Sequence, residues 1–428
     1  MRKPRFHYAW VVLAAVAATM FAGSGVRSSF GVFIRPLEEE FGWSRTSLSL
    51  VASLSLFLYG AVGPLVGRFA DRWGPRGVLA AAMVLLGIGT LGSSAVSSLG
   101  QFYATAGFVT SIGAGGAALS VAAAAIVRWF DARRGLALGI AGAGVAAGQL
   151  LIVPLVMAIT VVWNWRQAFV ILAVGVFVLI LPLALVFVRN SPREMGLAPY
   201  GAVEPTSAGI DRENSTERTS IGQAIRTVPF WLLAGSFWVC GYTTSGLVLT
   251  HLIPHAMEHG FYPGQAAQAL GSMGALNIVG TLASGWVCDR FGQKGPLAGY
   301  YLLRGLSLLF LPYVGTVPGL FAFAAIYGLN YISTVPATTS LTARIYGRYS
   351  VGELSGWIFL SHQIGAAVGS ALGGFAYDRF HDYTLAFHSA AVLAFLAVGM
   401  VLAIPEKHPM GGATVLPLPA GSKGQVSM

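Results

Sequence analysis

Residues 67–76 read Gly-Arg-Phe-Ala-Asp-Arg-Trp-Gly-Pro-Arg, and residues 285–294 read Gly-Trp-Val-Cys-Asp-Arg-Phe-Gly-Gln-Lys. Both stretches fit the pattern G-x-x-x-D-R-[aromatic]-G-x-[basic], and each follows a long apolar run. One copy alone is a weak signal. Two copies at matching places in two parts of a chain indicate an internal repeat. The sequence therefore predicts two related halves.

Long apolar runs fill most of the chain on both sides of these stretches. Hydrophobic residues make up 55% of the 428 and charged residues only 10%, whereas soluble domains carry roughly 25% charged residues. Each run is long enough to cross a bilayer of ~30 Å, and a backbone in lipid must satisfy its own hydrogen bonds, so the runs are helices. We expect an all-α membrane protein with twelve transmembrane helices in two pseudo-symmetric six-helix bundles. The expected spans are 8–34, 46–67, 77–97, 101–127, 135–159, 166–188, 229–257, 265–287, 296–314, 317–341, 354–377 and 384–404.

One long polar stretch divides the chain into two sets of six spans. We expect an N-terminal six-helix bundle over 1–190, a cytoplasmic linker over 191–228 and a C-terminal six-helix bundle over 229–405. The remaining residues, 406–428, form a polar tail that we also place in the cytoplasm.

The basic residues predict the orientation in the membrane. If both termini are cytoplasmic, 20 of the 26 Lys and Arg lie on the cytoplasmic side and four outside, and only Arg27 and Arg304 remain inside spans. Cytoplasmic loops carry such an excess. We expect a multi-pass protein of the cell inner membrane with both termini cytoplasmic. The net charge of +10 follows from these loops, so no nucleic-acid partner is expected.

The sequence offers no constellation typical of an enzyme or a cofactor site. Cys240 and Cys288 stand in apolar runs without metal-ligand spacing, and no phosphate-binding glycine loop occurs. His251, His255 and His259 are four apart, a spacing that can hold a metal, but no partner cluster stands near them. We expect no enzyme activity, no cofactor and no metal. The expected partners are lipid, a small-molecule substrate and protons, and the chain is expected to be a monomer.

The repeated stretch resembles the loop motif of the major facilitator superfamily, and the resemblance extends over essentially the whole chain. In that family the motif joins helices 2 and 3, and its copy joins helices 8 and 9. The resemblance implies a conformational latch made by Asp71 and Arg72 in one copy and by Asp289 and Arg290 in the other, since an Asp at a helix end can pair with Arg and with helix dipoles. The alternative is that these residues only fix the topology.

A narrower resemblance points to the monocarboxylate transporter family. Residues 129–148, Trp-Phe-Asp-Ala-Arg-Arg followed by closely spaced Gly and Ala, are similar to its helix-5 signature. Residues 35–38 and 41–44 are similar to bacterial members and to the related oxalate/formate exchangers. Residues 8–10, Tyr-Ala-Trp, retain part of the helix-1 element but lack its acid and its Gly.

The sequence departs from that family in helix 8. The family carries Asp or Asn there, and four residues later an Arg that binds substrate. The matching residues here are Asn277 and Thr281, which lie one turn apart on one helix face. We count both as candidate substrate contacts, but the cation is absent. Either another cation meets the substrate, or the substrate is larger, aromatic or less charged.

Ionisable residues at membrane depth are the remaining candidates, because each costs several kcal/mol there. Arg27, beside Ser28, is expected to bind an anionic group in a cavity; the alternative is that its side chain reaches outward to the headgroups. We expect Arg304 to be structural. His362 stands where similar exchangers carry a substrate-binding Lys, so it is either a cation and proton carrier or a neutral helix–helix contact. His251 is a second proton-site candidate.

These observations favour a secondary transporter that moves a small, monocarboxylate-like organic anion with a proton by alternating access. Two alternatives stay open. One is a carrier of an aromatic or vitamin-like solute such as a flavin, and the other is an anion exchanger of the oxalate/formate type. A membrane sensor is disfavoured because no signalling domain is attached.

Overall fold

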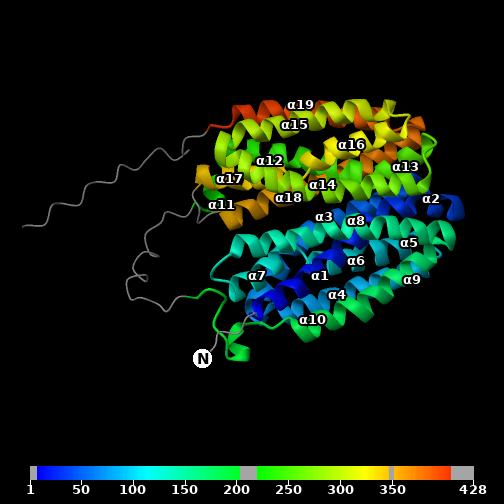
Figure 1. The fold of residues 1–428 in the computed structure, drawn as a ribbon. Coiled ribbons are helices and arrows are strands. Elements are labelled where there is room, and N and C mark those ends of the chain that lie inside the picture. The colour runs from blue at the N-terminus through cyan, green and yellow to red at the C-terminus, as the bar shows by residue number, and fades with distance from the viewer. Residues whose placement is uncertain (1–6, 203–218, 347–350, 406–428) are drawn as a thin grey trace, which may run out of the picture.

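The computed structural model describes residues 7–202, 219–346 and 351–405. In these ranges the chain forms long helices that lie side by side in two groups (Figure 1). The first group comes from the N-terminal half and the second from the C-terminal half, and each contains six helical stretches.

The N-terminal half contains continuous helices and helices assembled from shorter pieces. Two stretches contain a π-helical turn, a wider turn that often marks functional sites. The six stretches are α1 (Ala9–Ser28) with α2 (Phe30–Phe41), α3 (Arg45–Trp73), α4 (Pro75–Ser94), α5 (Leu99–Phe102) with η1 (Tyr103–Val109), α6 (Thr110–Gly116) and α7 (Leu119–Trp129), α8 (Arg134–Val162), and α9 (Trp165–Gly175) with η2 (Val176–Ile180) and α10 (Leu181–Phe187).

The C-terminal half repeats this plan after two short helices, η3 (Pro192–Met195) and α11 (Ile221–Ala224). Its first stretch also contains a π-helical turn, η5. The six stretches are α12 (Val228–Gly241) with η5 (Tyr242–Val248) and α13 (Leu249–Glu258), α14 (Pro263–Phe291), α15 (Lys294–Phe310) with η6 (Leu311–Tyr313), α16 (Val317–Asn330) with α17 (Thr334–Tyr346), α18 (Val351–Phe380), and α19 (Thr384–Ala403).

Ten of the twelve stretches are long and apolar enough to cross a membrane, judged by length and composition among the described residues. The other two are α14, whose middle carries the polar pair Asn277 and Thr281, and α15, which has 17 residues. Large apolar side chains remain exposed along many helices, for example Leu151 and Leu282. A lipid-facing surface explains such exposure.

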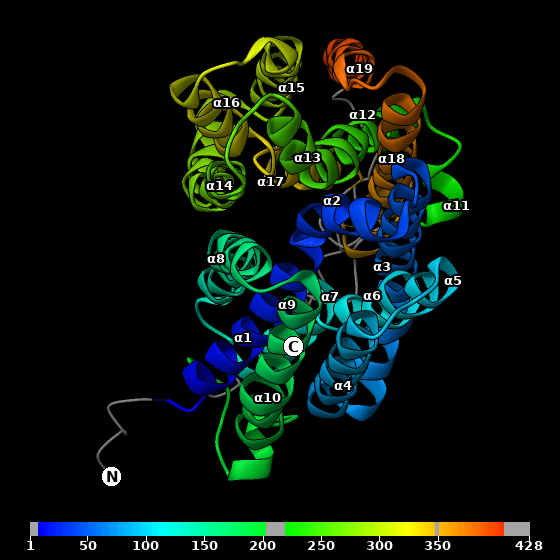
Figure 2. The same ribbon diagram turned by 90° about the vertical axis from the view of Figure 1, so that its right-hand side faces the viewer.

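The two halves meet along two helix pairs, α3 with α18 and α8 with α14. Figure 2 views the molecule along the helices and shows α2 of the first half between the two groups. We call the end where α3 begins the Arg45 end; it includes residues 42–44, 259–262 and 381–383. The opposite end carries both copies of the repeated stretch, and we call it the motif end.

The second Gly of each repeated stretch explains part of its pattern. Gly74 and Gly292 have φ of 91° and 78°, values that L side chains rarely adopt. Each ends one helix and allows the next to begin within three residues. A Cβ on Gly74 would lie 2.2 Å from Asn190 Oδ1, so a side chain is also excluded by contact. The repeat therefore encodes the same tight turn twice.

Candidate functional site

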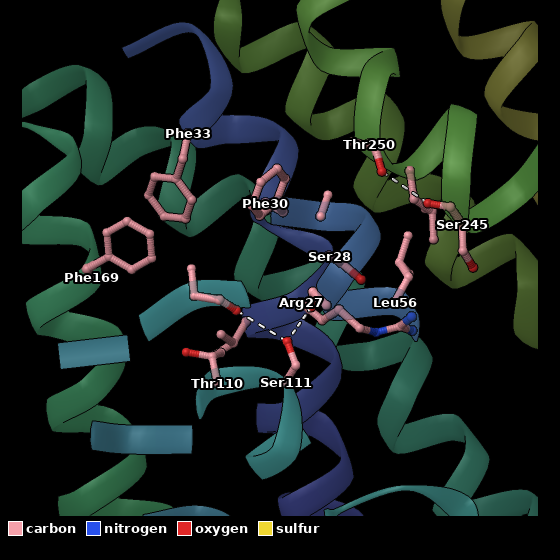
Figure 3. A pocket seen from close by; sticks show the side chains of 15 residues that line it. Arg27, Ser28, Phe30, Phe33, Leu56, Thr110, Ser111, Phe169, Ser245 and Thr250 are labelled. Carbon is pink, nitrogen blue, oxygen red and sulfur yellow. Dashed lines mark hydrogen bonds between the residues drawn. The ribbon is translucent and has the colours of Figure 1, made fainter. Parts of the chain in front are cut away.

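A pocket between the halves contains Arg27, which lies in the last turn of α1 (Figure 3). Most of its wall comes from the N-terminal half, and η5 and α13 of the other half add Ser245, Leu249 and Thr250. The π-helical turn η5 thus places C-terminal residues against the N-terminal wall. The lining residues are Val26, Arg27, Ser28, Phe30, Phe33, Ala52, Ser55, Leu56, Ala106, Thr110, Ser111, Phe169, Ser245, Leu249 and Thr250.

The Arg27 side chain is half-buried and available to a ligand. Its guanidinium carbon lies 4.7 Å from the centre of the Tyr59 ring. Within the described residues, Arg27 makes neither an ion pair nor a hydrogen bond through its side chain. It also borders a second, smaller cavity beside Tyr59 and Val145. An arginine in this setting can bind an anion without first losing a protein partner.

Aromatic rings form the apolar wall of the pocket. Phe33 and Phe169 stack with centroids 4.0 Å apart and planes 17° apart. Figure 3 shows them together, on the side away from the guanidinium of Arg27, with Phe30 between. Hydroxyl groups lie elsewhere on the wall, where Ser111 donates a hydrogen bond of 2.6 Å to Ser55. The pocket therefore has one cationic region and one aromatic region.

The helix-8 candidates lie together but do not line this pocket. Thr281 Oγ1 donates a hydrogen bond of 3.1 Å to Asn277 Oδ1, as their spacing of four predicts. Asn277 is buried and Thr281 is half-buried in α14. Of the five predicted substrate contacts, only Arg27 and Ser28 line the pocket.

His362 is buried in α18, and the next residue, Gln363, contacts the other half of the molecule. Its Nδ1 lies 2.8 Å from Gln363 Oε1, an oxygen that can only accept, so Nδ1 carries the proton. Gln363 Nε2 in turn donates to the carbonyl oxygen of Leu56, a pocket residue of the other half, at 3.2 Å. His362 is thus linked to the pocket wall through Gln363.

The three histidines of α13 and its end lie toward the Arg45 end. His251 is completely buried; its Nε2 donates to the carbonyl oxygen of Ser370 at 3.0 Å, and its Nδ1 has no hydrogen-bond partner among the residues that the structure describes. The rings of His255 and His259 lie 4.2 Å apart. Among the described residues, no three His, Cys, Asp or Glu side chains are arranged to hold a metal. His251 is next to Thr250 of the pocket wall but does not line the pocket itself.

At the Arg45 end, one buried arginine joins the two halves. Arg45, with 2% of its surface exposed, pairs with Glu38 of its own half at 2.9 Å and with Glu258 of the other half at 2.5 Å. Its guanidinium carbon lies 3.5 Å from the centre of the Tyr377 ring and its Nη1 donates to the Tyr383 hydroxyl. Burial raises the pKa of the Tyr383 phenol against the opposing charge of Arg45, so the hydroxyl stays neutral.

A carboxylate from the C-terminal half also caps the start of α3. Asp378 of α18 accepts hydrogen bonds from the backbone N–H groups of Arg45 and Thr46, at 3.1 and 2.8 Å. These are two of the donors that a helix N-terminus leaves unpaired. The sequence gives no sign of this cluster, because Glu258 and Asp378 are 213 and 333 residues away from Arg45 along the chain.

Comparisons with known proteins agree with this architecture. A family model described as Major Facilitator Superfamily matches residues 13–359 and 253–418. The chain belongs to the major facilitator superfamily. The predicted all-α fold of two helical bundles and the predicted family resemblance are thereby confirmed.

Relatives within the superfamily extend over nearly the whole chain. The Bacillus subtilis (strain 168) protein named Uncharacterized MFS-type transporter YcxA is 27% identical, covering 92% of this chain and 94% of its own. Monocarboxylate transporter 11 of Mus musculus is 28% identical, covering 93% and 89%. The name of the mouse relative agrees with the narrower resemblance found in the sequence.

Solved superfamily structures share the fold at low identity. A bacterial homologue of the human lysosomal transporter Spinster, in an inward-facing and occupied conformation, matches with a TM-score of 0.74 at 16% identity, over 94% of this chain and 97% of that one. The D-xylose–proton symporter matches with a TM-score of 0.73 at 17% identity, over 94% and 99%.

The latch that the superfamily motif implies stays a prediction. The side chains of Asp71 and Asp289 lie outside the described residues, as do residues 203–218 of the expected linker and the tail 406–428. Arg72 and Arg290 are exposed at the motif end beside aromatic rings, with guanidinium carbons 5.9 Å from the Trp73 ring and 5.6 Å from the Trp286 ring.

Proposed function

We propose that this superfamily member is a secondary transporter that moves a small organic anion across the cell membrane together with a proton. The observation that carries the proposal is the guanidinium of Arg27, which lies in a pocket between the halves and has no acidic partner among the described residues.

The depth of Arg27 supports a role in binding. It stands 18 residues after the start of α1 and 14 before the end of α2, or ~27 and ~21 Å along the helix at ~1.5 Å per residue. A side chain this deep does not reach the headgroups easily, and an unpaired cation inside a membrane protein usually marks a ligand path. A carboxylate can pair with both edges of the guanidinium.

The other wall of the pocket favours an anion with an apolar or aromatic body. Phe30, Phe33 and Phe169 offer surface to such a group, while a single arginine matches a single negative charge. A dianion such as oxalate would leave one charge without a cation on this wall. A neutral vitamin-like solute would leave Arg27 unpaired, so the monocarboxylate is the better fit.

Alternating access is supported by the way the halves meet. Arg45 and Asp378 tie the halves together at the Arg45 end, which the basic residues place outside the cell. In this arrangement the pocket would exchange solute with the cytoplasm at the motif end. Release of the Arg45 cluster would let the halves rock apart on the outer side.

Uptake into proteoliposomes tests the proposal directly. The panel contains benzoate, lactate, oxalate and riboflavin, each with and without an acidic outer solution. We expect benzoate or lactate uptake that acid outside accelerates. Arg27→Gln should weaken carboxylate binding by about 10-fold or more, because a charge-assisted hydrogen bond contributes ~1.5–3 kcal/mol.

The matched control is Arg226→Gln, which removes an exposed arginine outside the pocket and should leave uptake unchanged. Uptake of riboflavin alone would favour the vitamin-like alternative, and oxalate exchange without proton dependence would favour the exchanger. Carboxylate uptake with unaltered affinity in Arg27→Gln would contradict the assignment of Arg27.

A further inference from the structure

Arg27 borders two cavities, the pocket between the halves and a second cavity inside the N-terminal half. The wall of the second cavity comes from α1, α3, α8 and the stretch from α5 to α7. The pocket encloses about 700 Å³ of space free of protein atoms and the second cavity about 250 Å³. The second cavity is therefore the narrower of the two, and Arg27 gives its wall a positive charge.

The order of the wall residues along the helices places the second cavity on the motif-end side of Arg27. Helix α1 runs from the motif end, and it contributes Gly23, one turn before Arg27. Helix α3 runs toward the motif end, and it contributes Tyr59, which follows the pocket residue Leu56. The stretch from α5 to α7 also runs toward the motif end, and Ala117 follows the pocket residues of that stretch. Arg27 therefore lies between the two cavities along the helix direction.

Two side chains, and no backbone, make the contact at the junction of the cavities. The guanidinium carbon of Arg27 lies 4.7 Å from the centre of the Tyr59 ring, and both residues line the second cavity. On its other side the Tyr59 ring meets Phe359 of the C-terminal half, with ring centroids 6.4 Å apart. A cation–π contact depends on the charge over the ring, so an anion that neutralises Arg27 weakens it. Binding of an anion thereby loosens this junction.

Open space continues from the second cavity toward the motif end. Gly63 stands one turn beyond Tyr59 on α3, and Gly142 stands one turn before Val145, the wall residue from α8. A Cβ on either glycine would have no atom of another described helix within 4 Å. The basic residues predict that the motif end is cytoplasmic. The second cavity thus lies on the way from the pocket to the cytoplasm, while the Arg45 cluster closes the outer end.

An anion that leaves the pocket by this path must keep a cation beside it, because an unpaired charge away from water is strongly unfavourable. Arg27 meets this need, since the same guanidinium is on both walls and its N–H donors are spread over two edges. Ser24, on the wall of the second cavity, already donates its hydroxyl hydrogen to the carbonyl oxygen of Val145 at 2.9 Å. Attraction for an anion in the second cavity therefore comes from Arg27.

We infer that the second cavity is a second anion subsite, which takes the carboxylate of the transported anion between the pocket and the cytoplasm. Its role in transport rests on the proposed function, whereas its attraction for anions does not. The carboxylate passes from one edge of the Arg27 guanidinium to the other, the Tyr59 ring moves aside, and the apolar body follows from the pocket. One arginine thus holds the anion at two successive positions, and the anion is never without a cation on the way.

Cysteine labelling tests the subsite without any transport substrate. Ala117→Cys places a thiol on the wall of the second cavity, and both native cysteines are buried. Impermeant thiol reagents of negative and of positive charge are applied from the motif side. We expect Arg27→Gln to lower the ratio of the two labelling rates, negative over positive, by about 10-fold, because a charge in a cleft concentrates ions of opposite sign. Ala202→Cys, at an exposed residue, is the control and should keep its ratio. An unchanged ratio at Ala117→Cys, or no labelling there by either reagent, would overturn the subsite.

Benzoate transport in proteoliposomes tests the role of the subsite in transport. A Cβ on Gly23 would lie 3.6 Å from the Cβ of Ala117, an ordinary contact, so Gly23→Ala narrows the second cavity without a clash. We expect the maximal rate of uptake to fall by about 5-fold, because the added methyl crowds the passage, and the equilibrium affinity to stay unchanged. Gly235→Ala is the matched control, since its Cβ would lie 3.4 Å from Met400 Sδ, away from both cavities; it should keep rate and affinity.

An unchanged maximal rate in Gly23→Ala would overturn the role in transport, and so would a loss that appears only in affinity. If the wild-type protein moves no carboxylate at all, the proposed function fails and this role with it. The labelling ratio at Ala117→Cys still decides in that case whether the second cavity attracts anions.

Discussion

Arg27 and Arg304 are the same residue type, one inside each six-helix bundle, and they differ in burial and in the groups that their guanidiniums contact. Arg27 is half-buried beside a pocket, and its guanidinium lies over the Tyr59 ring. Arg304 is fully buried, donates to two carbonyl oxygens and lies beside two tyrosine rings, at 5.3 and 5.8 Å from their centres. The first is free to bind a ligand, whereas the second is committed to the protein.

The comparison teaches that depth alone does not identify a substrate-binding residue. Both arginines are costly by their position in the membrane. The two arginines differ in whether their guanidinium N–H groups already donate hydrogen bonds to neutral acceptors of the protein. An intramembrane arginine that keeps unused donors toward a cavity points to a solute, and one whose donors meet backbone carbonyls points to helix packing.

The largest expected effect is on stability when Arg304 is removed. Arg304→Gln leaves two buried carbonyl oxygens without their donor, which should destabilise the protein by about 3 kcal/mol at ~1–3 kcal/mol per unsatisfied group. The measurement is thermal unfolding in detergent, with the fraction of monodisperse protein as a second readout. Arg27→Gln is the matched variant and should unfold like wild type. Equal stability of the two variants would break the comparison.

A smaller effect is expected from Arg45, the buried arginine at the Arg45 end. Arg45→Gln removes the ion pair to Glu258 and should shift the halves toward an arrangement open at the Arg45 end. Thr250→Cys reports this, because Thr250 lines the pocket and both native cysteines are buried. We expect an impermeant thiol reagent applied from the Arg45 side to label Thr250→Cys several-fold faster.

Arg35→Gln is the control for this experiment, since it removes an exposed pair with Glu39 in the same region. Exposed pairs contribute ~0–1 kcal/mol, so its labelling rate should stay near that of the parent protein. Identical labelling of the Arg45→Gln and Arg35→Gln proteins would show that the Arg45 cluster does not hold the halves together.

The smallest effect concerns the ring beside Arg27. Tyr59→Leu removes a cation–π contact of ~0.5–1 kcal/mol, so benzoate affinity should fall by about 2- to 5-fold with stability unchanged. Tyr262→Leu, at an exposed tyrosine, is the control. A loss as large as that of Arg27→Gln would mean that Tyr59 contacts the anion itself, and the cationic region would then contain two essential residues.

Much of the fold could be predicted from the sequence because a backbone that crosses lipid must satisfy its own hydrogen bonds. Apolar runs of sufficient length had to be helices, and the two copies of the repeated stretch located the corresponding turns, where Gly74 and Gly292 adopt positive φ. The breaks within helices could not be predicted. The π-helical turns η1, η2 and η5 depend on packing between helices, and their local sequences contain no pattern that predicts a π-helical turn.

The candidate site was predictable only in its charges. Arg27 and Ser28 line the pocket, and polarity at membrane depth was enough to select Arg27. The aromatic wall was not predictable, because Phe33 and Phe169 look like any other lipid-facing or core residues until the helices are assembled. His362 was selected for its charge, but its link to the pocket wall, through Gln363 to the carbonyl oxygen of Leu56, forms only when the two halves are in contact.

The cap that Asp378 of the opposite half provides at the start of α3 has one more consequence. Ser44 caps this helix from within, by accepting from the N–H group of Ser47, while Asp378 supplies the cap for Arg45 and Thr46 from the opposite half. When the halves part at this end, the first two amides lose their acceptor and the third keeps its own. The exchange rate of the Arg45 and Thr46 amide hydrogens with deuterated water would then report how often the halves part at the Arg45 end, and the Ser47 amide would serve as an internal reference.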